Sequence, residues 1–292
     1  MDTWQEVRRG WNVYHYYFTL VIFFIFVVIN YFSRNFKVDS LNIPIMMSVV
    51  TFLFGFLTNI NFSMLLKKVH SLKEALANEA SRLVSLSLLS KNLGKEFHEK
   101  INNLIDNYTV YTLRDYKKYD SGREFVYEMY GVLPKMEMDS DYKKVVASKF
   151  LSELTALEGV REELEYLTSS KMEISMKIAN YLLGVVLIFL LFLNRGDIFT
   201  NLLFIILSTT IFFIFLIVED YDDLKIEDYA ANISNSEQIF DLIGKERYYP
   251  QEMLNRVKLE KGRKYRIGIF DSKSAKEKIF ELEYGKEKKS KK

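Results

Sequence analysis

Four stretches without Asp, Glu, Lys or Arg constrain this sequence more than any other feature. They run from Tyr14 to Phe32, Ile43 to Leu66, Ile178 to Leu193 and Ile198 to Val218. Each approaches the ~20 residues that a helix needs to cross ~30 Å of hydrocarbon. Trp11, Tyr14, Tyr31 and Tyr181 lie near their ends, as aromatic residues do at membrane interfaces. Four such stretches would leave a soluble core without amphipathic helices to cover it, so we expect four transmembrane helices rather than buried helices of a soluble protein.

The charged residues are concentrated between and after these stretches. Of the 292 residues, 49% are hydrophobic and 27% are charged, so the two kinds must be segregated along the chain. The residues after Phe32 do not resemble a signal-peptide cleavage site, so we expect the first stretch to remain as a span. The expected parts are an N-terminal segment with two spans (1–66), a helical region (67–177), two further spans (178–218) and a C-terminal tail or lobe (219–292).

The placement of Lys and Arg predicts the orientation in the membrane. Seven basic residues flank the spans on the side that holds both termini and the central region, namely Arg8, Arg9, Lys67, Lys68, Lys73, Lys171 and Lys177. The short loops on the opposite side carry Arg34, Lys37 and Arg195. Because cytoplasmic loops carry the excess of basic residues, we expect a multi-pass protein of the cell membrane with both termini cytoplasmic.

The region between the second and third spans reads as helix. An apolar stripe with helical spacing follows the second span, at Leu65, Val69, Leu72, Leu76, Ala80 and Leu83. A similar stripe from Phe150 to Leu167 precedes the third span, so we expect two helices that run continuously out of the membrane and back into it. Lys264 to Phe270 alternates and is compatible with one strand. The expected fold is an all-α membrane protein with long cytoplasmic helices and a small C-terminal cytoplasmic lobe.

The second span and its extension resemble the bestrophin family. Residues 52–56 read FLFGF, which is similar to the Phe-x-x-Gly-Phe run of bestrophins, and the polar residues Asn59 and Asn61 follow. Residues 78–84 read NEASRLV and resemble the Asn-Glu, Ser and Arg pattern of the next cytoplasmic helix. The layout of four spans with cytoplasmic ends is similar to that of the uncharacterised prokaryotic bestrophin-like proteins.

The resemblance implies a pentameric anion channel whose second helix lines the pore. Phe52 and Phe56 would form the hydrophobic neck, Ser48 would lie one turn earlier, and Gly55 would allow close approach of neighbouring helices. Asn59 and Asn61 would be polar groups of the pore or its vestibule. The implied activity is passive conduction of chloride through a homo-oligomer. Packing against lipid or other helices is the alternative reading of the two phenylalanines.

An acidic cluster follows the fourth span, at Glu219, Asp220, Asp222 and Asp223. Carboxylate oxygens are ligands that Ca²⁺ prefers, and animal bestrophins have an acidic run at the corresponding place that forms a calcium clasp. The alternative is that these carboxylates pair with Lys67, Lys68 or Arg8 at the same membrane face.

Other classes of function find little support in the sequence. The three histidines are scattered and no phosphate-binding glycine loop is present, so we do not expect an enzyme. A net charge of +2 gives no reason to expect a nucleic-acid partner. The expected partners are the lipid bilayer, further copies of the chain and inorganic ions. The competing hypothesis is a membrane anchor that does not conduct and whose cytoplasmic helices bind a partner.

Overall fold

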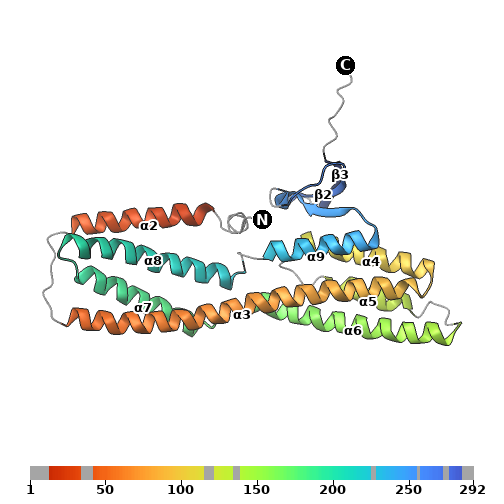
Figure 1. Ribbon diagram of the computed structural model, residues 1–292, viewed down its shortest axis with the longest axis horizontal. Coiled ribbons are helices and arrows are strands. Elements are labelled where there is room, and N and C mark those ends of the chain that lie inside the picture. Colours follow the sequence, from red (N-terminus) through yellow and green to blue (C-terminus); the bar gives the residue numbers. More distant parts are fainter. Residues whose placement is uncertain are drawn as a thin grey trace, which may run out of the picture. The chain divides into compact units, whose positions relative to one another are not determined.

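The fold consists of eight α-helices, one 3-10 helix (Gln251–Met253) and three strands within the part of the chain that the structure describes (Figure 1). This computed structural model describes residues 13–33, 42–114, 122–133, 139–224, 228–254, 257–271 and 276–284. The helices are α2 (Val13–Phe32), α3 (Ile43–Lys91), α4 (Lys95–Arg114), α5 (Arg123–Val132), α6 (Asp141–Ser169), α7 (Ile174–Leu193), α8 (Ile198–Asp222) and α9 (Asp228–Ile243). The strands are β1 (Arg247–Pro250), β2 (Lys264–Asp271) and β3 (Lys276–Glu283). Arg8, Arg9, Arg34 and Lys37, which entered the orientation prediction, lie outside the described residues.

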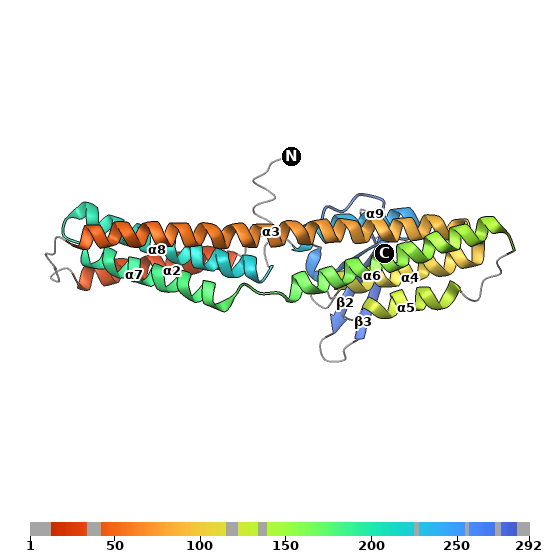
Figure 2. The same cartoon turned by 90° about the horizontal axis from the view of Figure 1, so that it is seen from below.

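The chain forms two compact units. The first unit comprises Met1–His70 and Ser170–Glu227, and the second comprises Ser71–Ser169 and Asp228–Lys292. In the first unit, α2, α7, α8 and the first part of α3 lie side by side (Figure 2). Their shared core is apolar and rich in aromatic residues, and it includes Phe26, Phe54, Leu187 and Phe204.

Three helical stretches are long and apolar enough to cross a membrane. They lie within Ile43–Lys91, Asp141–Leu193 and Ile198–Asp222, and they correspond to three of the four predicted spans. The described apolar stretch of α2, Tyr17–Phe32, is shorter, so the fourth span stays a prediction. Helix α8 begins at a capping box in which the Asp197 carboxylate accepts from the backbone N–H of Thr200 at 2.8 Å.

One of the two continuous helices that the sequence predicts is interrupted. Helix α3 runs unbroken from Ile43 to Lys91, but α6 ends at Ser169 and α7 begins only at Ile174. Within the first unit, side chains from distant residues form hydrogen bonds with the backbone N–H and C=O groups of this break. The Lys68 ammonium donates to the carbonyl of Ser170 at 2.6 Å, and the Asp222 carboxylate accepts from the backbone N–H of Met172 at 2.7 Å. The prediction of a continuous helix was wrong here because bonds from distant residues replace the helical ones.

The second unit has a helical core around a buried ion pair. The predicted stripe is buried, since Leu72, Leu76 and Leu83 expose 3%, 3% and 1% of their surface. Arg161 is also buried, and its guanidinium is 3.2 Å from the Glu79 carboxylate. The Tyr108 hydroxyl donates to Glu79 and accepts from Arg161.

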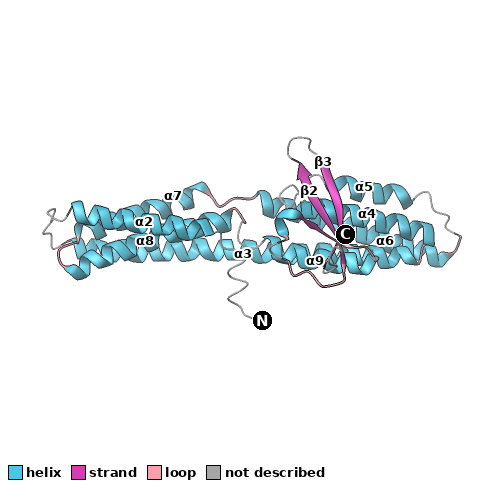
Figure 3. Ribbon diagram, turned by 90° about the horizontal axis from the view of Figure 1, so that it is seen from above, coloured by secondary structure: helices cyan, strands magenta, loops and turns pink. Residues whose placement is uncertain are grey.

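A three-stranded sheet completes the second unit, so the fold is mostly helical rather than all-α, and the strand expected at Lys264 to Phe270 is present as β2 (Figure 3). Strand β2 lies in the middle, parallel to β1 and antiparallel to β3. The alternating apolar residues of β2 explain why it lies against this unit's core. Tyr265 and Ile267 are two residues apart, so both point into that core. Strand β3 extends the sheet beyond that core, and its apolar side chains Ile279 and Phe280 are about half exposed, at 49% and 50%.

Candidate functional site

Five of the six residues predicted to line a pore share one exposed face of α3. Ser48, Phe52, Gly55, Phe56 and Asn59 are all exposed, in keeping with their spacing of three and four residues. Phe52 and Phe56 expose 71% and 59% of their surface. Their rings are stacked, with centroids 6.4 Å apart and planes 13° apart.

The exposed face of α3 is more polar than the exposed faces of the other apolar helices. Besides Ser48 and Asn59, it carries Thr51 and Ser63, which sequence reasoning did not single out. Among the described residues of α2, of α7 from 178 to 193 and of α8 up to 218, the exposed side chains are apolar or aromatic except Thr210. The hydroxyl of Thr210 is satisfied within its own helix, because it donates to the Ile206 carbonyl at 2.9 Å. Since polar groups at membrane depth face protein or water, this face of α3 is unsuited to lipid.

Asn61 lies elsewhere. It is completely buried in the first unit, so it does not share the exposed face with Asn59. Two residues along an α-helix correspond to a rotation of about 200°, which places the two amides on opposite sides of α3. One turn before Asn61, the Thr58 hydroxyl donates to the side-chain oxygen of Asn180 on α7 at 2.8 Å.

Three of the four carboxylates of the acidic cluster pair with a lysine of α7 or of the preceding break. The Lys177 ammonium lies 2.9 Å from the Glu219 carboxylate and 2.8 Å from that of Asp222. Lys171 pairs with Asp223 at 2.6 Å. These pairs join α7 to the last turn of α8, where carboxylates alone would oppose the helix macrodipole.

Lys68, one of the three basic residues that sequence reasoning proposed as partners, contacts backbone carbonyls at the end of α8 and at the break before α7. Lys68 donates to the backbone carbonyl of Asp222 at 3.1 Å, as well as to that of Ser170. A lysine on the last carbonyls of a helix compensates the negative end of its dipole. Lys171 and Lys177 were noticed in the sequence only as basic residues that flank a span.

Within the described ranges, no three His, Cys, Asp or Glu side chains are grouped so that they could hold a metal ion. The Asp222 carboxylate, which is 1% exposed, is occupied by Lys177 and the Met172 backbone N–H. A calcium ion would have to displace these donors. Calcium binding by Glu219, Asp220, Asp222 and Asp223 stays a prediction.

At the opposite end of the first unit, Arg195 ties α2 to the turn between α7 and α8. Its guanidinium donates to the side chains of Asn30 at 3.2 Å and Ser33 at 2.8 Å, and to the carbonyl of Phe192 at 2.7 Å. It also lies over the ring of Phe192, with 3.8 Å between the guanidinium carbon and the ring centroid. Arg195 is 7% exposed, so it holds the fold together here. The membrane orientation that was predicted partly from its charge stays a prediction.

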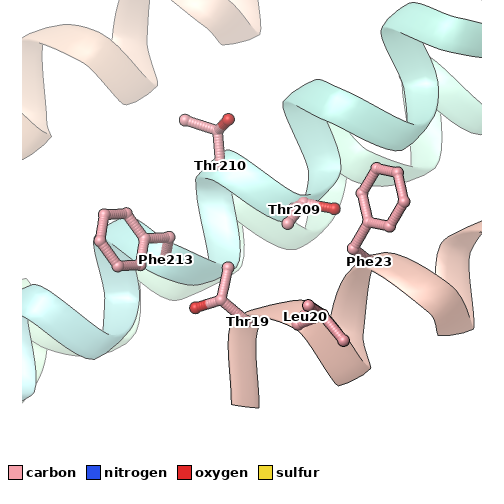
Figure 4. A pocket seen from close by; sticks show the side chains of 6 residues that line it. All are labelled: Thr19, Leu20, Phe23, Thr209, Thr210 and Phe213. Atoms are coloured by element: carbon pink, nitrogen blue, oxygen red, sulfur yellow. The ribbon is translucent and has the colours of Figure 1, made fainter. Parts of the chain in front are cut away.

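A groove of about 370 Å³ lies between α2 and α8 (Figure 4). Its walls are formed by Thr19, Leu20, Phe23, Thr209, Thr210 and Phe213. Thr209 and Thr210 donate their hydroxyls to carbonyls of their own helix, so they present mainly methyl groups. The groove offers no charged group that could support catalysis.

Comparisons with known proteins agree with this architecture. The family model described as Bestrophin-like domain matches residues 16–224. A tyrosine-to-alanine variant of a bacterial bestrophin homolog from Klebsiella pneumoniae has a similar structure, with a TM-score of 0.57, 11% identity, and coverage of 80% of this chain and 99% of that chain. The homolog solved by zinc phasing gives a TM-score of 0.54, 12% identity, and coverage of 80% and 99%. At these identities the likeness concerns the fold. No curated protein matches the sequence.

Proposed function

Because the chain belongs to the Bestrophin-like domain family, we propose that it forms a homo-oligomeric ion channel whose pore is lined by the exposed face of α3. Phe52 and Phe56 are the proposed constriction, with Ser48, Gly55 and Asn59 along the same face. The other proposed elements are α2 as a fourth span, cytoplasmic termini and five copies around one axis.

The observation that carries the proposal is the composition of the exposed face of α3. Ser48, Thr51, Asn59 and Ser63 are exposed in one copy of the chain, although they lie on a helix that is long and apolar enough to span a membrane. Leaving amides and hydroxyls in hydrocarbon is unfavourable, so this face requires either water or further protein. Copies arranged around an axis would supply both, because each α3 would meet its neighbours and the shared aqueous pore.

Anion conduction is the proposed activity. The Asn59 amide offers N–H donors, and the edges of the Phe52 and Phe56 rings carry partial positive charge. Such groups favour a partly dehydrated anion, while a ring of phenylalanines can close the pore by excluding water. No Lys or Arg lies between residues 43 and 66, so the proposed selectivity depends on dipoles rather than on full charges.

The test is single-channel recording in planar bilayers under a KCl gradient. We expect a reversal potential near that of chloride and an altered conductance or gating in Phe52→Ala/Phe56→Ala. Phe189→Ala on α7 is the matched control, because Phe189 is 57% exposed, close to the 59% of Phe56, yet lies on an apolar face. Equal effects of the control and the double variant would contradict the pore assignment, and silence from a verified oligomer would contradict conduction.

A membrane anchor that does not conduct is the second candidate, and one observation favours it. Strand β3 leaves Ile279, Phe280 and Leu282 between 38% and 50% exposed, and Tyr284 directly after it is 42% exposed, which is unusual for apolar side chains of a small sheet. A partner polypeptide that covered them would make the second unit a binding module. Silent bilayers together with stoichiometric capture of another protein, lost in Phe280→Lys, would support this reading.

A further inference from the structure

Two buried asparagines of the first unit have unsatisfied amides. Asn61 on α3 and Asn180 on α7 are both 0% exposed. In the part of the chain that the structure describes, neither polar atom of the Asn61 side chain has a hydrogen-bond partner, and the Asn180 side-chain nitrogen has none either. Buried polar groups nearly always have a partner, either in the protein or in ordered water.

Thr58 links these two amides. Thr58 and Asn61 are three residues apart on α3, so their side chains lie on the same face and on successive turns. Thr58 in turn reaches α7, because its hydroxyl donates to Asn180 at 2.8 Å. Thr58 therefore brings the Asn180 amide to the face of α3 that carries Asn61, on the side away from exposed Asn59.

We propose that Thr58, Asn61 and Asn180 form an internal water-binding site at membrane depth. A bound water needs two to four polar partners, and the two amides offer both donors and an acceptor. This combination distinguishes water from an anion, which would use the N–H donors and leave the Asn61 oxygen unsatisfied. The nearby cation, Lys177, is paired with Glu219 and Asp222, so it does not supply a charge for an anion here.

The site gives Asn61 a positioning role that does not depend on conduction. A bound water would join α3 to α7 through hydrogen bonds that can break and re-form. Direct side-chain packing would instead hold the two helices in one position. Because Asn59 and Asn61 point to opposite sides of α3, the water site also sets the rotation of α3 that keeps Asn59 exposed. The inference concerns the interior of one copy of the chain, so it can fail while the channel proposal holds, and the reverse.

The direct test is water-edited solid-state NMR on the full chain in lipid bilayers, with ¹⁵N-labelled asparagine. The signals of Asn61 and Asn180 are assigned from their loss in Asn61→Leu and Asn180→Leu, and that of Asn59 from Asn59→Leu. We expect magnetisation from water to reach the buried amides as it reaches exposed Asn59, because a bound water lies next to them. No transfer to the buried amides, in protein whose Asn59 signal builds up normally, would overturn the proposal.

Thermal unfolding supplies a second measurement with opposite expectations. If the site holds water, Asn61→Leu leaves Asn180 with fewer partners and lowers the melting temperature. If the site is dry, the same variant removes an unsatisfied amide and raises the melting temperature, which would contradict the proposal. Asn59→Leu is the matched control on the opposite face. Replacing chloride by gluconate should leave the buried amide signals unmoved, and a shift would mean that an anion occupies the site instead.

Discussion

Arg161→Met should destabilise the second unit, and the size of the effect should depend on pH. Arg161 and Glu79 are almost completely buried, with side chains 1% and 7% exposed and 3.2 Å between the charged atoms. Breaking such a pair by removing one partner typically costs about 3–5 kcal/mol, because the remaining charge stays buried. The Glu79 carboxylate can escape this cost by taking up a proton.

The free energy needed to protonate Glu79 sets the expected loss of stability in Arg161→Met. Protonating a carboxyl group of ordinary pKa, ~4.3, takes about 1.4 kcal/mol for each pH unit above that value. The penalty of Arg161→Met is therefore limited to about 4 kcal/mol at pH 7 and falls to about 1 kcal/mol at pH 5. The direction follows from proton binding, since the folded variant holds a proton that its unfolded chain releases above pH ~4.3, so acidification stabilises the variant.

Hydrogen exchange is a suitable assay because it reports the opening free energy of each unit separately. Peptides from α4 and α6 should lose protection in Arg161→Met at pH 7 and regain most of it at pH 5. The double variant Arg161→Met/Glu79→Gln should be close to wild type at both values. Arg82→Met is the control, because the Arg82–Glu153 pair is 41% and 26% exposed and should contribute at most about 1 kcal/mol. A double variant as unstable as the single one, or a loss independent of pH, would refute the reasoning.

Three further predictions test other parts of the fold. Gly184→Val should lower the melting temperature by several degrees, since a side chain there collides with a phenylalanine ring of α8 and overpacking costs about 1–3 kcal/mol; Gly159→Ala, with nothing within 4 Å, should not. The hydrogen bond from Arg247 lowers the pKa of Asp241, so this carboxylate contributes stability above pH ~4 that is lost as the pH falls through its folded pKa. Asp241→Asn should therefore flatten the acid dependence of the urea midpoint, and an unchanged slope would contradict the assignment. Arg195→Met should increase hydrogen exchange at residues 28–33, because it removes the ties to α2.

The membrane helices were predictable because their signal is local. Length and absence of charge identify α3, α7 and α8, and the spacing of the apolar stripe predicts which side of α3 is buried in the second unit. The same reasoning failed at the break between α6 and α7. Residues 170–173 contain neither Gly nor Pro, and the helix ends there because Lys68 and Asp222, far away in sequence, take its backbone groups.

In the candidate site too, features set by local sequence were predictable and those set by distant residues were not. Helical spacing alone places Ser48, Phe52 and Phe56 on one face, and it could also have separated Asn59 from Asn61. The partners of the acidic cluster could not be read in this way, since Lys177 and Asp222 are 45 residues apart. Of the sheet, the sequence indicated only β2, whose residues alternate. Strand β3 is exposed and mixes charged with apolar residues, so no burial pattern marks it.

The split of the first unit along the sequence has a consequence for synthesis at the ribosome. Residues 71–169 separate its two halves, so α7 and α8 emerge only after the second unit has largely been made. At about 5–20 residues per second, that interval lasts roughly 5–20 s. During it, α3 lacks its packing partners α7 and α8, and Thr58 has been made before Asn180 exists to accept its hydrogen bond. Until Asn180 is made, the Thr58 hydroxyl has to use another acceptor, such as a carbonyl of its own helix.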